Sequence, residues 1–331
     1  MVDLLLKVLH AFLIAGLALP LSAAGLVWAE RRVSAFIQDR LGPNRVGPSG
    51  LLQPIADLLK FIFKEDVVPG HVNKVLYIIA PALTLIPAMI VFCVIPYARG
   101  MAIANLNVGV LLVFAISSLG VYGIVIGGWA SNSKFSLFGG VRASAQMISY
   151  ELALGLSVIP VFLIVGELNL EEIVAWQKAN VWLVFPLFPA FVLFLVSTYA
   201  ETNRLPFDCP EAETELVAGY HTEFGSMKFA MFFLAEYINM ITASALVVTL
   251  FFGGYTIPFF DLPEGIWGTV LSGASFVAKC GFFLFLFIWV RWTLPRFRYD
   301  QLMDLGWKAM LPLSLGVIVL VAGVKAFLFA G

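Results

Sequence analysis

The stretch NVGVLLVFAISSLGVYGIVIGGW, residues 107–129, carries no charged side chain and decides the fold class. A helix rises about 1.5 Å per residue, so about 20 apolar residues cross a hydrocarbon core of about 30 Å. Similar apolar runs lie on either side of this stretch, near residues 8–29, 75–98, 142–166, 181–200, 229–253, 268–290 and 309–330. The sequence therefore predicts an all-α integral membrane protein with about eight transmembrane helices, in a single transmembrane domain over residues 1–331.

The composition of the chain agrees with this fold class. Hydrophobic residues make up 61% of the chain and charged residues 12%, whereas soluble domains carry about 25% charged residues. The first apolar run, Val8–Ala29, is too long for the core of a signal peptide. Charged Glu30, Arg31 and Arg32 follow it, where a cleavage site needs small residues. We therefore expect this run to be a retained span.

The distribution of lysine and arginine predicts the orientation, because cytoplasmic loops hold the excess of these residues. With eight spans, most of the 20 lysines and arginines fall in the loop after the first span and in every second loop from there. The other side holds only Lys7, Arg99, Lys178 and Lys325, and Lys279 lies within a span. We expect both termini on the periplasmic side of a bacterial inner membrane, or on the intermembrane side of a mitochondrial one.

The segment 51–64, in the long loop after the first span, predicts a second kind of membrane element. Its apolar residues recur at helical spacing, while Gln53, Asp57, Lys60 and Lys64 lie on the opposite face. A helix of about 13 residues is too short to cross a bilayer. We therefore expect an amphipathic helix in the membrane interface. The alternative is an ordinary amphipathic helix packed on another domain.

The cysteines and histidines of the chain are the candidates for a metal site. They lie far apart in the sequence: Cys93, Cys209, Cys280, His10, His71 and His221. Their spacing fits none of the usual zinc or iron–sulfur patterns. We therefore expect this chain to bind no metal or redox cofactor by itself, and any redox centre to belong to a partner.

Ionisable residues inside the apolar runs point to a working site, because each is costly in a bilayer unless it is paired, hydrated or neutralised. Glu151 and Glu236 lie inside spans, Glu201 lies at the end of another, and Lys279 lies in the middle of the seventh. The alternative is that they form buried pairs that only hold helices together. Several carboxylates with one lysine favour a proton relay.

The segment 201–228 predicts an acidic loop on the side that is otherwise positively charged. Its acidic residues, opposed only by Arg204 up to residue 223, are Glu201, Asp208, Glu211, Glu213, Glu215 and Glu223. A solvated acidic turn is the alternative, but apolar residues such as Phe207 and Phe224 interleave with the acids, as if to pack in a crevice. Closely placed carboxylates repel one another, so we expect some of them to have raised pKa values.

A group of mainly basic and aromatic residues, which also includes the acidic Glu30, follows two of the spans on this same side. They are Glu30, Arg31, Phe36 and Arg40 after the first span, and Arg291, Arg296 and Arg298 after the seventh. Positive charge and aromatic rings also anchor a span at the membrane surface, which is the alternative reading. Enclosed arginines could instead hold the acidic loop and attract an anionic intermediate.

Three long motifs carry a family resemblance. The first is ERR at 30–32 with QDRLGPNRVGP at 38–48 and GLLQPIAD at 50–57. The second is AETNRLPFD at 200–208 with EAETELV at 211–217, and the third is PRFRYDQLM at 295–303. In this order they resemble the loops of the quinone-channel membrane subunit of proton-pumping NADH:quinone oxidoreductase (respiratory complex I). One variation is His221, where asparagine is frequent in that family.

The resemblance implies a subunit without a redox centre that docks below a soluble arm, with quinone as substrate and with the iron–sulfur cluster and FMN in partner subunits. The first and sixth spans and the interfacial helix would frame the quinone entry from lipid, and the loop 201–228 would face the quinone chamber. The implied channel and chamber residues are Glu30, Arg31, Phe36, Arg40, Asp57, Arg204, Phe207, Phe224, Arg291, Arg296 and Arg298. The implied proton relay is Glu151, Glu201, Asp208, Glu211, Glu213, Glu215, Glu223, Glu236 and Lys279.

Two other functions are weighed against this one, and none of the three involves nucleic acid. The homologous subunit of a membrane-bound hydrogenase or formate hydrogenlyase shares the fold, but the acidic and arginine motifs match the quinone-reducing branch. Inhibition by rotenone-like compounds would separate the two. A stand-alone secondary transporter is disfavoured, because the sequence shows no inverted repeat of the kind that many transporters have.

Overall fold

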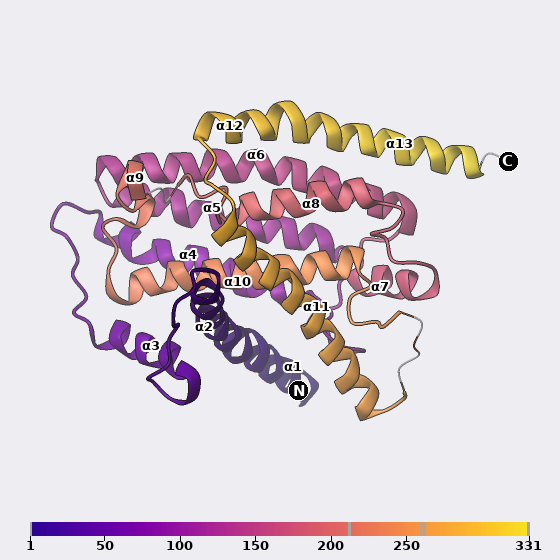
Figure 1. Cartoon of the computed structure of the whole chain (residues 1–331). Helices are drawn as coiled ribbons and strands as arrows, with labels where there is room; N and C mark the ends of the chain where they lie inside the picture. Colours follow the sequence, from indigo (N-terminus) through magenta and orange to yellow (C-terminus); the bar gives the residue numbers. More distant parts are fainter. Residues whose placement is uncertain (1, 211–212, 259, 261–262, 330–331) are drawn as a thin grey trace.

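The computed structural model describes residues 2–210, 213–258, 260 and 263–329, and within them the regular structure is helical. Seven helical stretches in this part of the chain are long and apolar enough to cross a membrane. Five of them are single helices: α4 (Lys74–Phe92), α5 (Gly109–Ala130), α6 (Lys134–Val165), α10 (Ser226–Phe251) and α11 (Ile266–Thr293). The predicted all-α membrane fold is confirmed (Figure 1).

The first and last spans are each assembled from three consecutive helical pieces with a π-helical turn in the middle. The first span is built from α1 (Val2–Ala11), η1 (Phe12–Ala18) and α2 (Leu19–Ile37). The last is built from α12 (Tyr299–Asp304), η4 (Leu305–Met310) and α13 (Leu311–Phe329). Figure 1 shows α13 lying along the outside of the bundle.

The predicted span at 181–200 is helical only in its second half. The helix α8 is Phe188–Glu201, with 14 residues, and the segment 181–187 ahead of it is irregular. Pro186 explains the late start, because proline lacks an N–H group and disfavours a helical residue before it. One side of this segment packs against protein: Leu183 and Leu187 are fully buried, and the Val184 N–H donates to the Phe251 carbonyl at 3.0 Å. Its other side is open, with Phe185 71% exposed.

A short helix that the apolar runs do not predict precedes this segment. It is α7 (Leu170–Ala179), and Asn169 caps it by accepting a hydrogen bond from the Glu171 N–H at 2.9 Å. Asparagine at this position satisfies one of the free N–H groups at a helix start. With only 10 residues, α7 lies at one end of the bundle (Figure 1).

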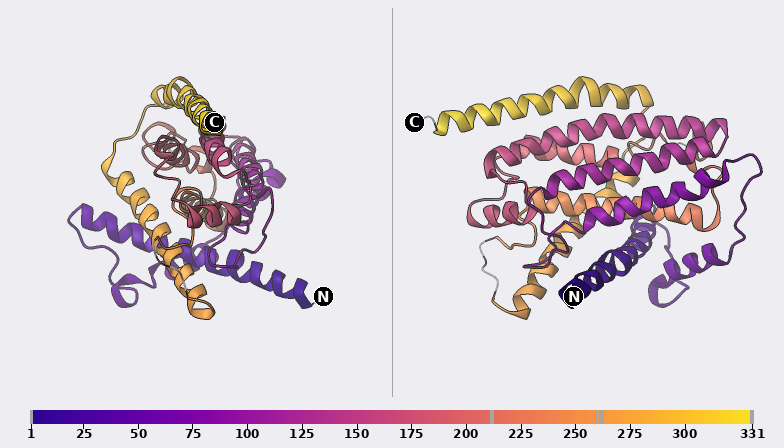
Figure 2. Two further views of the ribbon diagram at one scale, coloured as in Figure 1. Left: turned by 90° about the vertical axis from the view of Figure 1, so that its right-hand side faces the viewer. Right: turned by 180° about the vertical axis from the view of Figure 1, so that it is seen from behind.

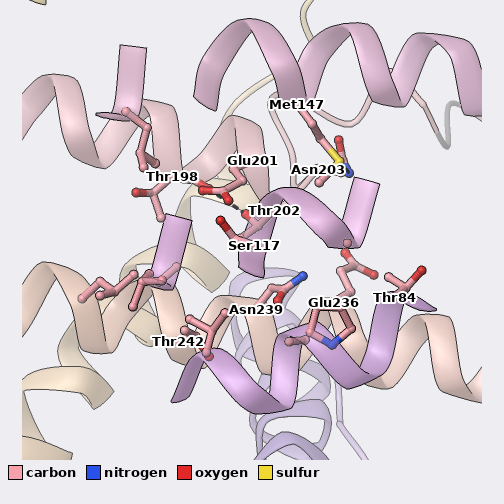
Figure 3. Close-up of a pocket in the computed structure, with 18 of the residues that line it drawn as sticks. Thr84, Ser117, Met147, Thr198, Glu201, Thr202, Asn203, Glu236, Asn239 and Thr242 are labelled. Atoms are coloured by element: carbon pink, nitrogen blue, oxygen red, sulfur yellow. Dashed lines mark hydrogen bonds between the residues drawn. The ribbon is translucent and has the colours of Figure 1, made fainter. Parts of the chain in front are cut away.

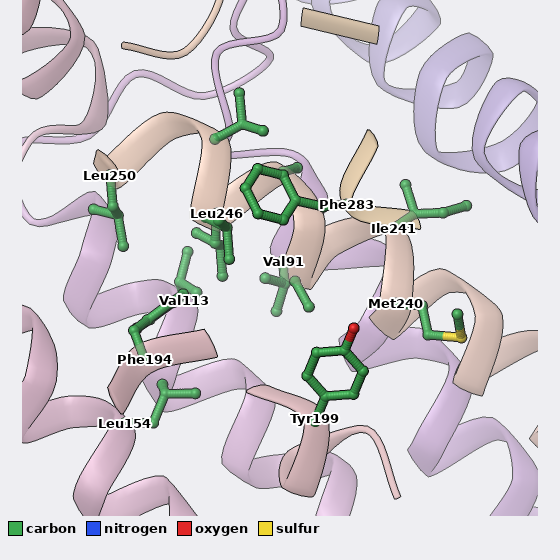
Figure 4. Close-up of a cluster of buried hydrophobic side chains, with 14 of the residues drawn as sticks. Val91, Val113, Leu154, Phe194, Tyr199, Met240, Ile241, Leu246, Leu250 and Phe283 are labelled. Carbon is green, nitrogen blue, oxygen red and sulfur yellow. The ribbon is translucent and has the colours of Figure 1, made fainter. Parts of the chain in front are cut away.

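The helix α10 is the centre of the bundle. In its most apolar stretch 72% of the residues are buried, against 11% in the span that ends in α13. It packs against α2, α3, α4, α7, α8 and α11. Figure 4 shows part of the resulting core, in which side chains of α10 such as Met240 and Leu246 meet Phe194, Tyr199 and Phe283 from α8 and α11.

Close packing, rather than the hydrophobic effect, must hold these helices together, because lipid tails are as apolar as leucine. The contact between α4 and α5 is an example. A Cβ atom at Gly123 would lie 2.1 Å from Thr84 Oγ1, and so only glycine permits this approach. At Gly139 on α6, a Cβ atom would lie 2.5 Å from the Tyr220 backbone nitrogen, which brings the acidic loop against α6.

The loops gather at two ends of the bundle, which we call the acidic end and the α7 end. The acidic end holds α3 (Gln53–Phe63), α9 (Glu213–Leu216) and η3 (Gly219–His221). Figure 1 and the right-hand view of Figure 2 show the α7 end on the opposite side. Contacts between loops confirm the grouping: Asn132 Nδ2 donates to the His71 carbonyl at 3.1 Å, and the Phe297 N–H donates to the Pro206 carbonyl at 3.0 Å. Which end faces the cytoplasm stays a prediction.

Candidate functional site

A buried group of charged side chains lies where α2, α10, α11 and the loop after α8 meet, and we call it the ion cluster. It consists of Glu30, Arg204, Glu236, Tyr237 and Arg291. Arg204 Nε lies 2.6 Å from Glu236 Oε1, and Arg204 Nη1 lies 3.6 Å from Glu30 Oε1. Arg291 Nη1 donates a hydrogen bond to Glu30 Oε1, and the Tyr237 hydroxyl donates to Glu30 Oε2 at 2.8 Å. The exposed fraction of the side chain is 4% for Arg204 and 7% for Glu30, so the centre of the cluster is buried, whereas Arg291 at its edge is 28% exposed.

The charges of the ion cluster depend on one another. Burial by itself would lower the pKa of Arg204, but Glu236, Tyr237 and Glu30 outweigh it and raise that pKa. The guanidinium also lies 4.4 Å from the centre of the Tyr237 ring, at cation–π distance. An unpaired buried charge is strongly destabilising. Arg204 is the close cationic partner of Glu236, and it shares Glu30 with Arg291.

A polar cavity lies next to the ion cluster, between α4, α5, α6, α8 and α10 (Figure 3). Its volume, about 70 Å³ for the centres of water-sized molecules, exceeds the roughly 10–15 Å³ that one water requires, so water fits in it. Its polar lining includes Ser117, Glu201, Glu236, Asn239 and Thr242. Glu236 therefore belongs both to the ion cluster and to the polar cavity.

Glu201 is the second carboxylate of the polar cavity. It lies at the end of α8 and accepts a hydrogen bond from the Ser117 hydroxyl of α5 (Figure 3). Glu151 on α6 lies close enough for its charge to act on Glu201. The structure therefore brings together the three intramembrane carboxylates that the sequence singles out: Glu236 and Glu201 share the cavity, and Glu151 adjoins it.

The acids of the loop after α8 face basic residues rather than one another, as far as the structure describes them. Asp208 lies 2.9 Å from Arg296 Nη2, and Glu215 lies 2.6 Å from Arg142 Nη1. Glu223 lies 3.9 Å from His71 Nε2, a longer contact. Each partner comes from a different element, so the loop is held on several sides. Glu211 lies outside the described residues, and of Glu213 only the backbone, in α9, is described.

Most apolar residues of the acidic loop are buried, as the interleaved sequence predicts, although Val217 is 58% exposed. Phe207 lies 5.7 Å from the Tyr150 ring and 5.5 Å from the Phe297 ring, between ring centres. Phe224 stacks on Tyr77 with ring centres 4.2 Å apart. These contacts pack the loop into a crevice. That Phe207 and Phe224 line a quinone chamber stays a prediction.

His221 lies in the same crevice, outside the spans. Its ring makes edge contacts with Tyr220 at 4.9 Å and with Phe229 at 5.3 Å, between ring centres. Burial lowers the pKa of His221 to about 4. The imidazole is therefore neutral at physiological pH, and it acts there as an aromatic packing group.

The remaining predicted channel residues lie nearer the surface. Arg31 Nη1 pairs with Asp57 Oδ2 at 2.6 Å, which ties α2 to α3. Partial burial acts to raise the pKa of Asp57, but hydrogen bonds from Gln53, Arg31 and Lys60 outweigh it and lower that pKa. Phe36 is 71% exposed, and two further exposed residues are Arg40 and Arg298. The apolar residues of α3 are exposed as well, and the membrane-interface position of segment 51–64 stays a prediction.

Lys279 lies apart from the carboxylates. Its ammonium donates to the carbonyls of Phe252 at 2.8 Å, Gly254 at 2.9 Å and Thr256 at 2.5 Å, and it lies 4.7 Å from the Trp182 ring centre. These carbonyls follow the end of α10, roughly 24 Å along that helix from Glu236 at about 1.5 Å per residue. The structure does not bring Lys279 together with the acids, so its part in a proton relay stays a prediction.

Sequence reasoning missed the uncharged polar residues of this site. They are Ser117, Gln146, Asn239 and Thr242. The spacing of Glu236, Asn239 and Thr242 would have indicated one polar face of a helix. Charge draws attention in an apolar run and a lone amide or hydroxyl does not, so these residues were not singled out.

Comparisons with known proteins agree with this architecture. The profile of the NADH dehydrogenase family matches residues 10–322. The chain is 53% identical to NADH-quinone oxidoreductase subunit 8 of Rhodothermus marinus, over 96% of this chain and 97% of that protein. It is 54% identical to the NADH-quinone oxidoreductase H subunit of Salinibacter ruber, over 96% of each, and 54% identical to the H subunit of Rickettsia rickettsii, over 93% of this chain and 90% of that protein. The chain therefore belongs to the NADH dehydrogenase family, among the H subunits of NADH-quinone oxidoreductases.

Proposed function

We propose that the chain is the membrane subunit of a proton-pumping NADH-quinone oxidoreductase that admits quinone from the lipid and couples its reduction to proton movement. The names of the relatives support the enzyme class. In this proposal NADH oxidation, FMN and the iron–sulfur clusters belong to partner subunits, and this chain contributes the quinone entry, part of the quinone chamber and the buried carboxylates.

One observation carries the coupling part of the proposal: Glu236 is shared between the ion cluster and the polar cavity. Adding two electrons to a quinone brings negative charge into an enclosed region, where charges interact far more strongly than in water. That charge competes with Glu236 and Glu30 for Arg204 and favours protonation of a carboxylate. Protonation of Glu236 weakens its pairing with Arg204 and alters the charge that faces Glu201, 35 residues away in sequence but across one cavity.

The quinone entry is proposed at the meeting of α2, α3 and α10. These helices pack against one another, and the outward residues of α3 are apolar, with Ile55 51% and Phe63 84% exposed. An isoprenoid tail would pass along such a surface from the lipid. Arg31 and Asp57 would fix the distance between α2 and α3 at this opening.

The experiment that tests the proposal uses the whole enzyme in sealed vesicles. We expect Glu201→Gln and Glu236→Gln to lower the number of protons pumped per NADH oxidised at least twofold, because an amide cannot exchange the proton. The matched control is Glu172→Gln, an exposed acid on α7 at the opposite end. If both cavity variants reduced quinone and pumped protons at the unaltered rates, the coupling role would be wrong.

A further inference from the structure

Gln146 is a fully buried side chain on α6 that the proposed mechanism does not use. Its exposed fraction is 0%, and its amide nitrogen faces three acceptors from the end of α8 and the start of the acidic loop. Gln146 Nε2 lies 2.8 Å from the Ala200 carbonyl, 2.8 Å from the Phe207 carbonyl and 3.1 Å from Asn203 Oδ1. One side chain therefore gathers three points of a segment that reverses direction.

The orientation of this amide follows from its partners. Backbone carbonyl oxygens only accept hydrogen bonds, so the end of Gln146 that faces the Ala200 and Phe207 carbonyls must be the nitrogen. The other end, Gln146 Oε1, is buried and has no hydrogen-bond partner in the part of the chain that the structure describes. An unsatisfied buried acceptor is unfavourable. The donors of Gln146 are therefore what explains a polar residue at this place.

The segment that Gln146 holds separates the two parts of the site. Glu201, next to Ala200, points into the polar cavity, and Arg204, next to Asn203, belongs to the ion cluster. The chain can turn between them because Asn203 adopts a left-handed conformation, with φ +51°, which asparagine tolerates better than most residues. The Asn203 side chain accepts from Gln146 and donates to Met147 Sδ at 3.5 Å, so this conformation is fixed from α6.

We infer that Gln146 is the positioning residue that fixes Glu201 relative to the Arg204–Glu236 pair. Its two N–H groups hold the backbone on both sides of Arg204, at Ala200 and at Phe207. Without these bonds the turn can shift, and the distance between Glu201 and Arg204 is no longer fixed. A change of charge at Arg204 then no longer has a fixed electrostatic effect on Glu201. Gln146 itself touches neither quinone nor a transferred proton. The inference rests on the proposed coupling function of the polar cavity.

The test substitutes Gln146→Met in the whole oxidoreductase, reconstituted in sealed vesicles. Methionine has a similar shape but no N–H group. We expect the number of protons pumped per NADH to fall at least twofold, with the KM for quinone within twofold of the unaltered enzyme. A residue that only filled space would change the amount of assembled enzyme and not this ratio, so an unchanged ratio in the assembled variant overturns the inference.

The chain offers a matched control at the α7 end. Gln177 is also buried, with 2% exposed, and it also holds a helix end: Nε2 donates to the Thr249 carbonyl at 2.9 Å, and Oε1 accepts from the Gly253 N–H at 3.0 Å. Gln177→Met should leave the proton-to-NADH ratio unchanged. If it lowers the ratio as much as Gln146→Met, a general loss of packing is responsible and the inference fails.

A second variant decides the matter if Gln146→Met does not assemble. Asn203→Gly keeps the left-handed backbone and removes one of the three acceptors, so we expect a smaller fall in the ratio; no fall overturns the inference.

The Glu201→Gln and Glu236→Gln enzymes distinguish a failure of the proposed coupling function from a failure of the positioning role of Gln146. If they pump normally, the coupling function itself is wrong. If they lose pumping while Gln146→Met and Asn203→Gly keep it, only the positioning role is wrong.

Discussion

Two places along α10 each hold a cation away from bulk solvent, and the two cations are held in different ways. Arg204 at the acidic end is paired with carboxylates, at 2.6 Å from Glu236 and 3.6 Å from Glu30. Lys279 at the α7 end is surrounded by backbone carbonyls, from Phe252 to Thr256. A carboxylate can take up a proton, whereas a carbonyl cannot. The comparison teaches that the cation at the acidic end is held by groups that can take up a proton, whereas the cation at the α7 end is held by groups that cannot.

The largest effect that this comparison predicts is at Arg204. Arg204→Met leaves Glu236 and Glu30 buried with only Arg291 as a cation, and we expect a loss of about 3–5 kcal/mol of stability. The measurement is the midpoint of thermal unfolding of the solubilised enzyme. Arg298→Met is the control, because that side chain is 78% exposed. If Arg204→Met were as stable as Arg298→Met, the buried carboxylates would not need Arg204 as their partner.

The next effect is at Lys279. Lys279→Met removes three hydrogen bonds from a charged donor, and because part of this is recovered by relaxation we expect a loss of about 2–4 kcal/mol. Unfolding experiments measure the loss, and vesicle assays measure the protons pumped per NADH in the enzyme that assembles. We expect the ratio to stay at its unaltered value. A fall in the ratio would break the comparison, since Lys279 would then belong to the proton relay.

A smaller effect should depend on pH through His221. Its folded pKa of about 4 lies below the ordinary value of 6.5, so on acidification the unfolded chain takes up a proton first. The contribution of the neutral ring is complete above pH 6.5 and is lost as the pH falls through 4. The shift corresponds to about 3 kcal/mol, which partial exposure reduces to roughly 1–2. Unfolding midpoints of the unaltered and His221→Asn proteins, measured from pH 7 to 4, should converge; parallel curves would contradict the burial of a neutral ring.

The smallest effect is expected at the surface pair of the acidic end. Arg31 and Asp57 are 2.6 Å apart, but the Arg31 side chain is 48% exposed. Exposed ion pairs contribute about 0–1 kcal/mol, so Asp57→Asn should change the unfolding midpoint little at neutral pH. A loss of stability as large as that of Arg204→Met would show that burial does not determine how much a charged residue contributes to stability in this protein.

The sequence predicted most of the fold, because long uncharged runs have few alternatives to a membrane helix. The spans at α4, α5, α6, α10 and α11 follow the apolar runs closely. The irregular segment 181–187 was not predicted, since its residues are as apolar as those of a helix and its contact with the end of α10 cannot be read from the sequence. The short helix α7 was missed because it is too short and too polar to give a periodic signal.

The sequence predicted which charged residues belong to the candidate site, but it did not predict how they are arranged in space. Glu30, Arg204 and Glu236 stand out in the sequence because charge is costly in a membrane. That they meet depends on how α2, α8 and α10 pack, which the sequence pattern does not contain. Gln146 was missed for a related reason: an amide carries no charge, and its importance comes from three acceptors that belong to a distant part of the chain.

The central position of α10 also bears on how the protein is made. Of the seven described spans it is the most buried, and it has the lowest mean hydropathy. Insertion machinery selects nascent segments by their hydrophobicity, so α10 is the segment least able to enter lipid unaided. We therefore expect α10 to enter the membrane most readily when the earlier spans are already in place to receive it.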